Sequence, residues 1–218
     1  GREVDFNPIT VHQQKRIIST ALESSLNTMS FSVIASNIVK DCCAEENLTI
    51  YSLDRDAILI GLRTHMLGYD ITGQTSIGEE RPVNIEDHYK LFSSHKAPKT
   101  LLSSKILKYN DINITFKPPT LDTDMIVCKR ARTVVDKIIK DTGLADTIGE
   151  VIVYELVKYV KRIEVNDKTL DFNHTDSLQL VKVLEQLPLK LSKMMLTEVN
   201  RIKRFEDKFS VIQSPSEN

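Results

Sequence analysis

Apolar residues recur every three or four positions in the first 68 residues, and this spacing predicts three helices. The first helix covers residues 10–26 with Thr10 as its N-cap, and the second covers residues 30–44. The third follows Asp54, whose carboxylate can accept hydrogen bonds from the first free backbone N–H groups. Gly68 ends it, because glycine adopts the left-handed conformation after a last turn without penalty. We expect the three helices to form an antiparallel trio.

A different pattern, short alternation of apolar and polar residues, follows Gly68 and predicts strands. These alternations lie within residues 69–117, where we expect one small antiparallel sheet. The segment Tyr109-Asn110-Asp111 predicts a hairpin turn, since asparagine and aspartate tolerate turn dihedrals. Pro118 and Pro119 should end the sheet, because proline has no N–H to donate to a ladder.

Helical spacing returns over residues 122–140 and 146–162 and predicts two more helices. A two-stranded hairpin around Asn166-Asp167 follows at residues 163–172, then a helix capped by Thr175 or Asp176, and a last amphipathic helix at residues 188–209. The fold class predicted is α+β, with helical N-terminal and C-terminal parts around a small antiparallel sheet. The three parts are 1–68, 69–120 and 121–218, and we expect them to form one compact chain.

The composition is that of a globular protein, with 41% hydrophobic and 27% charged residues in 218. A net charge of −1 gives no overall electrostatic reason to bind nucleic acid or an anionic membrane. No apolar run is long enough for a transmembrane helix, and the first residues lack the apolar core of a signal peptide. We therefore expect a protein that works inside a cell, where Cys42, Cys43 and Cys128 stay reduced.

No catalytic or ligand-binding motif emerges from the residues. The segment from Gly73 to Gly78 has the glycine spacing of a phosphate loop, but Glu79 and Glu80 stand where lysine and serine or threonine are required. His88 and His95 lack a second pair of ligands at metal spacing. We expect no enzyme activity, no cofactor and no metal.

Two features are candidates for partner binding. Arg63 is a lone cation in a mostly apolar helix, and it either lies along the rim of the core or contacts a partner directly. The last helix carries an apolar stripe that is either ordinary core or a docking face, because methionine suits adaptable surfaces and amphipathic helices bind in grooves. The candidate residues on this stripe are Met194, Met195, Phe205 and Phe209. Basic residues on the same helix are interspersed with acidic ones, which is typical of a solvated face and not of a nucleic-acid reader.

Several segments resemble the T-even phage baseplate protein family in order and spacing. Near the N-terminus the matching residues are Ile9-Thr10-Val11, Lys15 and Ala21-Leu22-Glu23-Ser24. The stretch LTIYSLDRDAILIGLRTHMLGYDI resembles the family's segment L-T-x-x-D-x-x-x-L-x-x-x-L-R-x-x-S-x-G. Pro118-Pro119-Thr120 and the hairpin and helix IEVNDKTLDFNHTDSLQLVKVLEQLP complete a likeness that covers roughly residues 6–190. Relatives often carry cysteine pairs after the arginine helix, whereas this chain has Gln74-Thr75-Ser76, so we carry over no metal.

The resemblance implies a non-enzymatic baseplate hub subunit or hub assembly factor of a contractile-tailed bacteriophage. Its partners would be other hub or tail proteins, including the tape-measure protein, with a homo-oligomer left open. An alternative is a transient chaperone that holds hub or tape-measure proteins soluble and is absent from the finished virion. The expected location is the host cytoplasm during assembly, or the tail baseplate of the virion.

Overall fold

The computed structural model describes residues 4–23, 28–74, 78–87, 89–90, 99–141, 147–172 and 176–210. For 20–23, 28, 74, 147–148 and 205–210 it describes the backbone alone. The helices are α1 (Val11–Glu23), α2 (Thr28–Cys42), α3 (Arg55–Leu67), α5 (Lys99–Leu102), α6 (Leu121–Asp141), α7 (Thr147–Tyr159), α8 (Ser177–Glu185) and α9 (Leu189–Ser210). The strands are β1 (Asp70–Gln74), β2 (Glu80–Asn84), β3 (Lys105–Tyr109), β4 (Ile112–Phe116), β5 (Val160–Val165) and β6 (Lys168–Asp171). The predicted α+β class is confirmed.

The helix starts show which local predictions were right. Thr10 caps α1 through a reciprocal pair, in which the Gln13 N–H donates to Thr10 Oγ1 and the Thr10 N–H donates to Gln13 Oε1. Asp176 caps α8 by accepting from the Leu178 N–H at 3.0 Å, whereas Thr175 lies outside the described residues. Asp54 does precede α3, but its side chain makes no capping bond, because a 3₁₀ turn at Ser52–Asp54 leads into the helix.

The prediction of a single sheet within residues 69–117 was wrong. β1 and β2 form a separate two-stranded ribbon, and the other strands form an antiparallel sheet in the order β3-β4-β5-β6. The hairpin that turns at Asn166 therefore pairs with β4 and completes the sheet. β4 is a central strand whose ladder groups need partners on both sides, and the local pattern does not show which distant strand supplies the second one.

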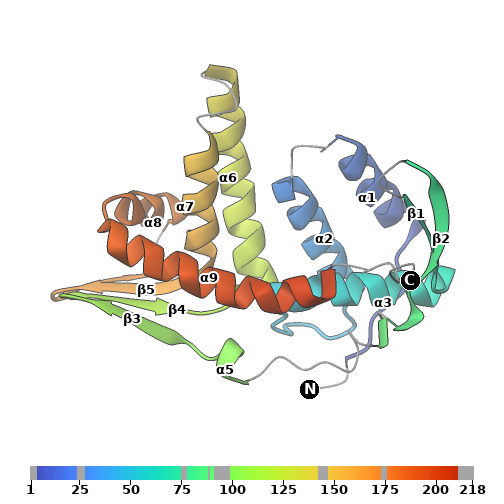
Figure 1. Ribbon diagram of the computed structural model, residues 1–218, viewed down its shortest axis with the longest axis horizontal. Coiled ribbons are helices and arrows are strands. Elements are labelled where there is room, and N and C mark those ends of the chain that lie inside the picture. The colour runs from blue at the N-terminus through green and yellow to red at the C-terminus, as the bar shows by residue number, and fades with distance from the viewer. Residues whose placement is uncertain are drawn as a thin grey trace, which may run out of the picture.

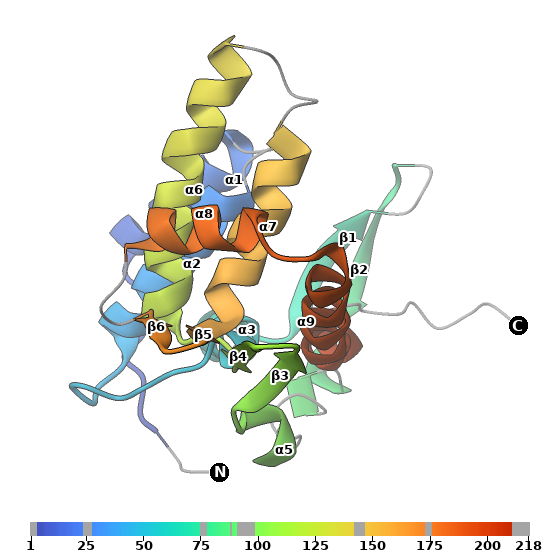
Figure 2. The same cartoon turned by 90° about the vertical axis from the view of Figure 1, so that its left-hand side faces the viewer.

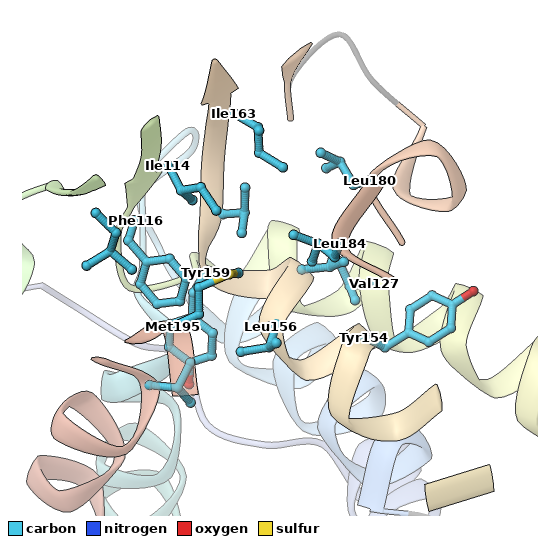
Figure 3. Close-up of a cluster of buried hydrophobic side chains, with 14 of the residues drawn as sticks. Ile114, Phe116, Val127, Tyr154, Leu156, Tyr159, Ile163, Leu180, Leu184 and Met195 are labelled. Carbon is cyan, nitrogen blue, oxygen red and sulfur yellow. The ribbon is translucent and has the colours of Figure 1, made fainter. Parts of the chain in front are cut away.

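The main core lies between one face of the four-stranded sheet and the helices α6, α7, α8 and α9 (Figure 1). Ile114 and Ile163 are paired neighbours on that face, and Phe116 stacks on Tyr159 with ring centroids 5.6 Å apart. Figure 3 shows these side chains meeting Val127, Leu184 and Met195 from three helices. Removing such a large apolar area from water is the main source of stability for a chain of this size.

A second apolar region joins α1, α2 and α3, with Ile38, Cys42 and Leu62 at its centre. Next to it, Val39 and Ile50 pack with Leu121, so the start of α6 belongs to the N-terminal helices as well as to the main core. The upper part of the α6–α7 hairpin rises from the body, and the β1–β2 ribbon lies at another end of the molecule (Figures 1 and 2).

Candidate protein-interaction surfaces

Arg63 holds the base of the β1–β2 ribbon. Its guanidinium donates one hydrogen bond to the carbonyl of Gly68 and another to the carbonyl of Asp70, both at 2.5 Å. Gly68 is the C-cap of α3 with φ 75°, so Arg63 bonds the chain where it leaves the helix and enters β1. This geometry agrees with one of the two interpretations of the sequence, in which Arg63 lies at the rim of the core with its head group paired. Direct contact of Arg63 with a partner stays a prediction.

The candidate residues of α9 lie against the main core. Met195 is 0% exposed, and the half-buried Met194 packs beside it. Leu191, Val199 and Ile202 continue the same buried stripe. The side chains of Phe205 and Phe209 lie outside the described residues. The structure thus brings Met194 and Met195 together at the main core, while Arg63 lies apart from them on α3. Docking of a partner by α9 stays a prediction.

A buried ionic cluster connects α3, α6 and α7, and sequence reasoning did not find it. Asp124, 3% exposed, accepts from Arg55 Nη1 at 2.9 Å and from Lys158 Nζ at 3.0 Å. Lys158 also contacts Glu155 Oε2 at 2.8 Å, and Lys203 of α9 contacts the other oxygen at the same distance. The buried Asp124 and the partly buried Glu155 therefore have two cations each, which is the condition for keeping charges away from water.

The pKa values in this cluster follow its geometry. Burial alone would lower the pKa of Lys158, but the neighbouring Glu155 and Asp124 outweigh burial and raise it above the ordinary value. For Glu155 burial alone would raise the pKa, but Lys158 and Lys203 outweigh burial and lower it. Both groups stay charged at neutral pH, so the cluster acts as a fixed set of ion pairs and not as a proton donor or acceptor.

Cys128 is the one nucleophile next to this cluster within the described chain, and its thiol is unreactive. Its Sγ lies 3.8 Å from Asp124 Oδ1, and burial raises the pKa of the thiol to about 11. A thiol with this pKa is protonated at neutral pH, and the thiolate is the form that attacks. Among the described residues, no group of three histidine, cysteine or carboxylate side chains could hold a metal ion.

Two shallow hollows lie on the described surface. One, about 250 Å³, is lined by His12, Lys15, Arg16, Ser19 and Ile34 between α1 and α2. The other, about 400 Å³, lies between α6 and the start of α8 and is lined by Ile126, Lys129, Arg130, Thr133, Asp176 and Ser177. Ile126, which is 55% exposed, lines this hollow beside Lys129 and Arg130. Sequence reasoning did not find this hollow, although Ile126 stands three residues before the basic pair Lys129-Arg130.

Large apolar side chains are also exposed on other elements. They include Val11 and Ile18 on α1, Met66 and Leu67 on α3, Ile106 on β3, Ile139 on α6, Val151 and Ile152 on α7, and Leu189 and Leu196 on α9. No helix in the described part of the chain is both long and apolar enough to cross a membrane.

By fold, the chain is an α+β protein with helices packed on one face of a small antiparallel sheet. By family, it is a phage baseplate protein. The family described as T4 bacteriophage base plate protein matches residues 1–211, so the chain belongs to that family and the resemblance found in the sequence is confirmed. Membership implies contacts with other proteins of the phage tail. Comparison with curated proteins gave no match, and comparison with solved structures gave none either.

Proposed function

We propose that the chain is a non-enzymatic component of the baseplate hub, or a factor that assembles the hub, and that it acts through contacts with other tail proteins. The observation that carries this proposal is that the family described as T4 bacteriophage base plate protein matches residues 1–211 of the chain.

The described elements that extend from the body, the α6–α7 hairpin and the β1–β2 ribbon, offer surface for such contacts (Figure 2). Ile139, Val151 and Ile152 are exposed apolar residues on the hairpin. Exposed apolar area is stabilised when a partner covers it.

The buried polar groups support a structural role. Asp124, Glu155 and Lys158 form ion pairs with one another and with neighbouring cations, and none of them lines either of the two hollows. Catalytic carboxylates and lysines are instead expected in a cleft, with pKa values brought close to the working pH. Here the pKa of Glu155 is lowered and that of Lys158 is raised, away from neutrality in both cases.

The experiment that tests the proposal is mass spectrometry of tails purified from infected cells, together with the proteins that co-purify with the tagged chain. A hub subunit should be present in purified tails in a fixed ratio to other hub proteins. A chaperone should co-purify with hub or tape-measure proteins before tails are complete and be absent from finished tails. A chain that is absent from tails and co-purifies with no tail protein would contradict the proposal.

A further inference from the structure

β3 is an edge strand whose outer side has no pairing strand among the described residues. It pairs with β4 in a regular antiparallel register from Lys105↔Phe116 to Tyr109↔Ile112, and it is first in the sheet order. Its five residues contain no proline and no bulge. Such an edge presents unpaired backbone N–H and C=O groups to which another extended chain can bond.

The hydrogen bonds of the sheet determine which residues of β3 present these groups. The Asn166 N–H donates to the carbonyl of Asp111. Because backbone groups alternate in direction along an antiparallel strand, those of Asn113 and Thr115 also point toward β5. The residues between them, including Ile114, must bond toward β3, where Ile114 faces Leu107. The backbone groups of Leu107 therefore point into the sheet, and those of Ile106 and Lys108 point outward.

The side chains of Ile106 and Lys108 leave an apolar group and a charge without a described partner at this edge. Ile106 is 56% exposed although it lies in the middle of the strand. Lys108 has no ion pair with any residue that the structure describes. Both side chains lie on the sheet face away from the main core, since Leu107 between them is buried. A partner strand would cover Ile106 and bring side chains next to Lys108.

The charge of the edge selects the kind of partner. Lys108 is the lysine of this strand that has no ion pair with a described residue, because Lys105 Nζ already lies 2.5 Å from Oε2 of the buried Glu198. A lysine on an edge strand opposes pairing with a strand that places another cation beside it. Two copies of β3 side by side would place both Lys108 side chains on one face of the seam without a counter-ion, which like-charge repulsion disfavours. A strand with a carboxylate beside Lys108 meets no such barrier.

We propose that β3 accepts an extended acidic segment of another baseplate protein as a fifth strand of the sheet. The segment bonds to the N–H and C=O groups of Ile106 and Lys108, covers Ile106 with an apolar side chain and places a carboxylate beside Lys108. Main-chain bonds then provide affinity, and the two side chains provide selectivity. This inference rests on the proposed function, because the partner is a component of the same assembly.

Substitution at Ile106 tests the proposal with a matched control. Ile106→Pro removes only an outward-pointing N–H, so the ladder between β3 and β4 keeps its bonds. Ile106→Val keeps the N–H and most of the apolar side chain. Phage particles and assembly intermediates are purified from infected cells that make each variant as the full chain. Wild type and Ile106→Val should be recovered in them equally, and Ile106→Pro at least about tenfold less, since proline both removes the donor and blocks the approaching strand.

Hydrogen exchange gives a second measurement that needs no variant. The amides of Ile106 and Lys108 should exchange at least about tenfold more slowly in the particles than in the isolated chain, because ladder bonding protects them. The amide of Ile114, already bonded to β3, should be protected in both states. Thermal unfolding and the Ile114 amide of isolated Ile106→Pro show whether that variant keeps its fold.

The outcomes are distinguishable. Equal recovery of folded Ile106→Pro, or unprotected β3 amides in particles that contain the chain, overturns the fifth strand and leaves the proposed function standing. Sedimentation that shows a wild-type dimer and a monomeric Ile106→Pro overturns the acidic partner in favour of a second copy. Absence of the wild-type chain from every particle and intermediate overturns the proposed function, and the inference with it.

Discussion

Lys158 Nζ lies 3.0 Å from Oδ1 of Asp124, and this contact ties α7 to α6 beneath the protein surface. The second oxygen of Asp124 accepts from Arg55 at the start of α3. One buried carboxylate thus connects the N-terminal helices to the helices of the main core. The backbone supports the same junction, because the Leu121 N–H donates to Ile50 O and the Ser52 N–H donates to Pro119 O, both at 2.9 Å.

We expect Asp124→Asn to destabilise the chain strongly. It leaves Arg55 and Lys158 without their shared anion in a buried site, and breaking a buried pair in this way costs about 3–5 kcal/mol. The free energy of unfolding in urea measures the loss. Asp122→Asn is the matched control on the same helix, because its pair with Lys40 is exposed and worth about 1 kcal/mol or less. Similar losses in the two variants would contradict a special role for the buried cluster.

We expect acid to weaken the fold partly through Glu155. Burial opposes its charge, but Lys158 and Lys203 outweigh burial, and the pKa in the folded state is lower than the ordinary 4.5. The stabilisation is therefore fully present above pH 4.5 and is lost as the pH falls through the lowered pKa of the folded state. Urea unfolding at a series of pH values should give a smaller acid-side slope for Glu155→Gln than for wild type.

Some acid-side slope should remain in Glu155→Gln. Glu198 also has a lowered pKa, since hydrogen bonds and charge from Arg201 and Lys105 outweigh the effect of burial. An unchanged slope in Glu155→Gln would show that the Glu155 carboxyl is not coupled to folding as its geometry indicates.

We expect Arg63→Ala to loosen the β1–β2 ribbon and little else. The substitution removes both bonds to the carbonyls of Gly68 and Asp70, and a two-stranded ribbon is only marginally stable by itself. The free energy of local opening should fall by about 1–2 kcal/mol, measured by amide exchange within β1 and β2. The control is His65→Ala, an exposed position on the same helix. Equal amide exchange in the two variants would contradict a stabilising role of Arg63 in the ribbon.

We expect Met195→Ala to cost about 2–5 kcal/mol of unfolding free energy, because it leaves a cavity in the main core. Leu196→Ala, at the next position and 37% exposed, should cost about 1 kcal/mol or less. If α9 is core, a chain truncated after Pro188 should aggregate or lose cooperative unfolding. A truncated chain that folds and stays soluble but loses its partners would instead support the docking prediction for α9.

The sequence by itself determined the elements that depend on neighbouring residues. Thr10 was predicted as a cap, and so was Thr175 or Asp176, of which Asp176 caps α8. The turns at Asn110 and Asn166 were predicted from residues that tolerate positive φ, which both adopt. Helical periodicity located α6 and α9 to within one or two residues, because it reflects which side of a helix is apolar. These features, together with the order of segments that resembles the baseplate family, were enough for the fold class and the family.

The tertiary structure alone decided how those elements meet. Asp124 pairs with Arg55, 69 positions away in the sequence, and Lys105 pairs with Glu198, 93 positions away. No local pattern encodes such pairs. The predicted helix over residues 146–162 ends instead at Tyr159, because Val160 begins the strand that pairs with β4. The same pairing leaves β3 at the edge, which makes Ile106 exposed and Leu107 buried. Periodicity shows that a face is apolar, but only packing against distant residues decides which apolar face is covered and which remains open to another protein.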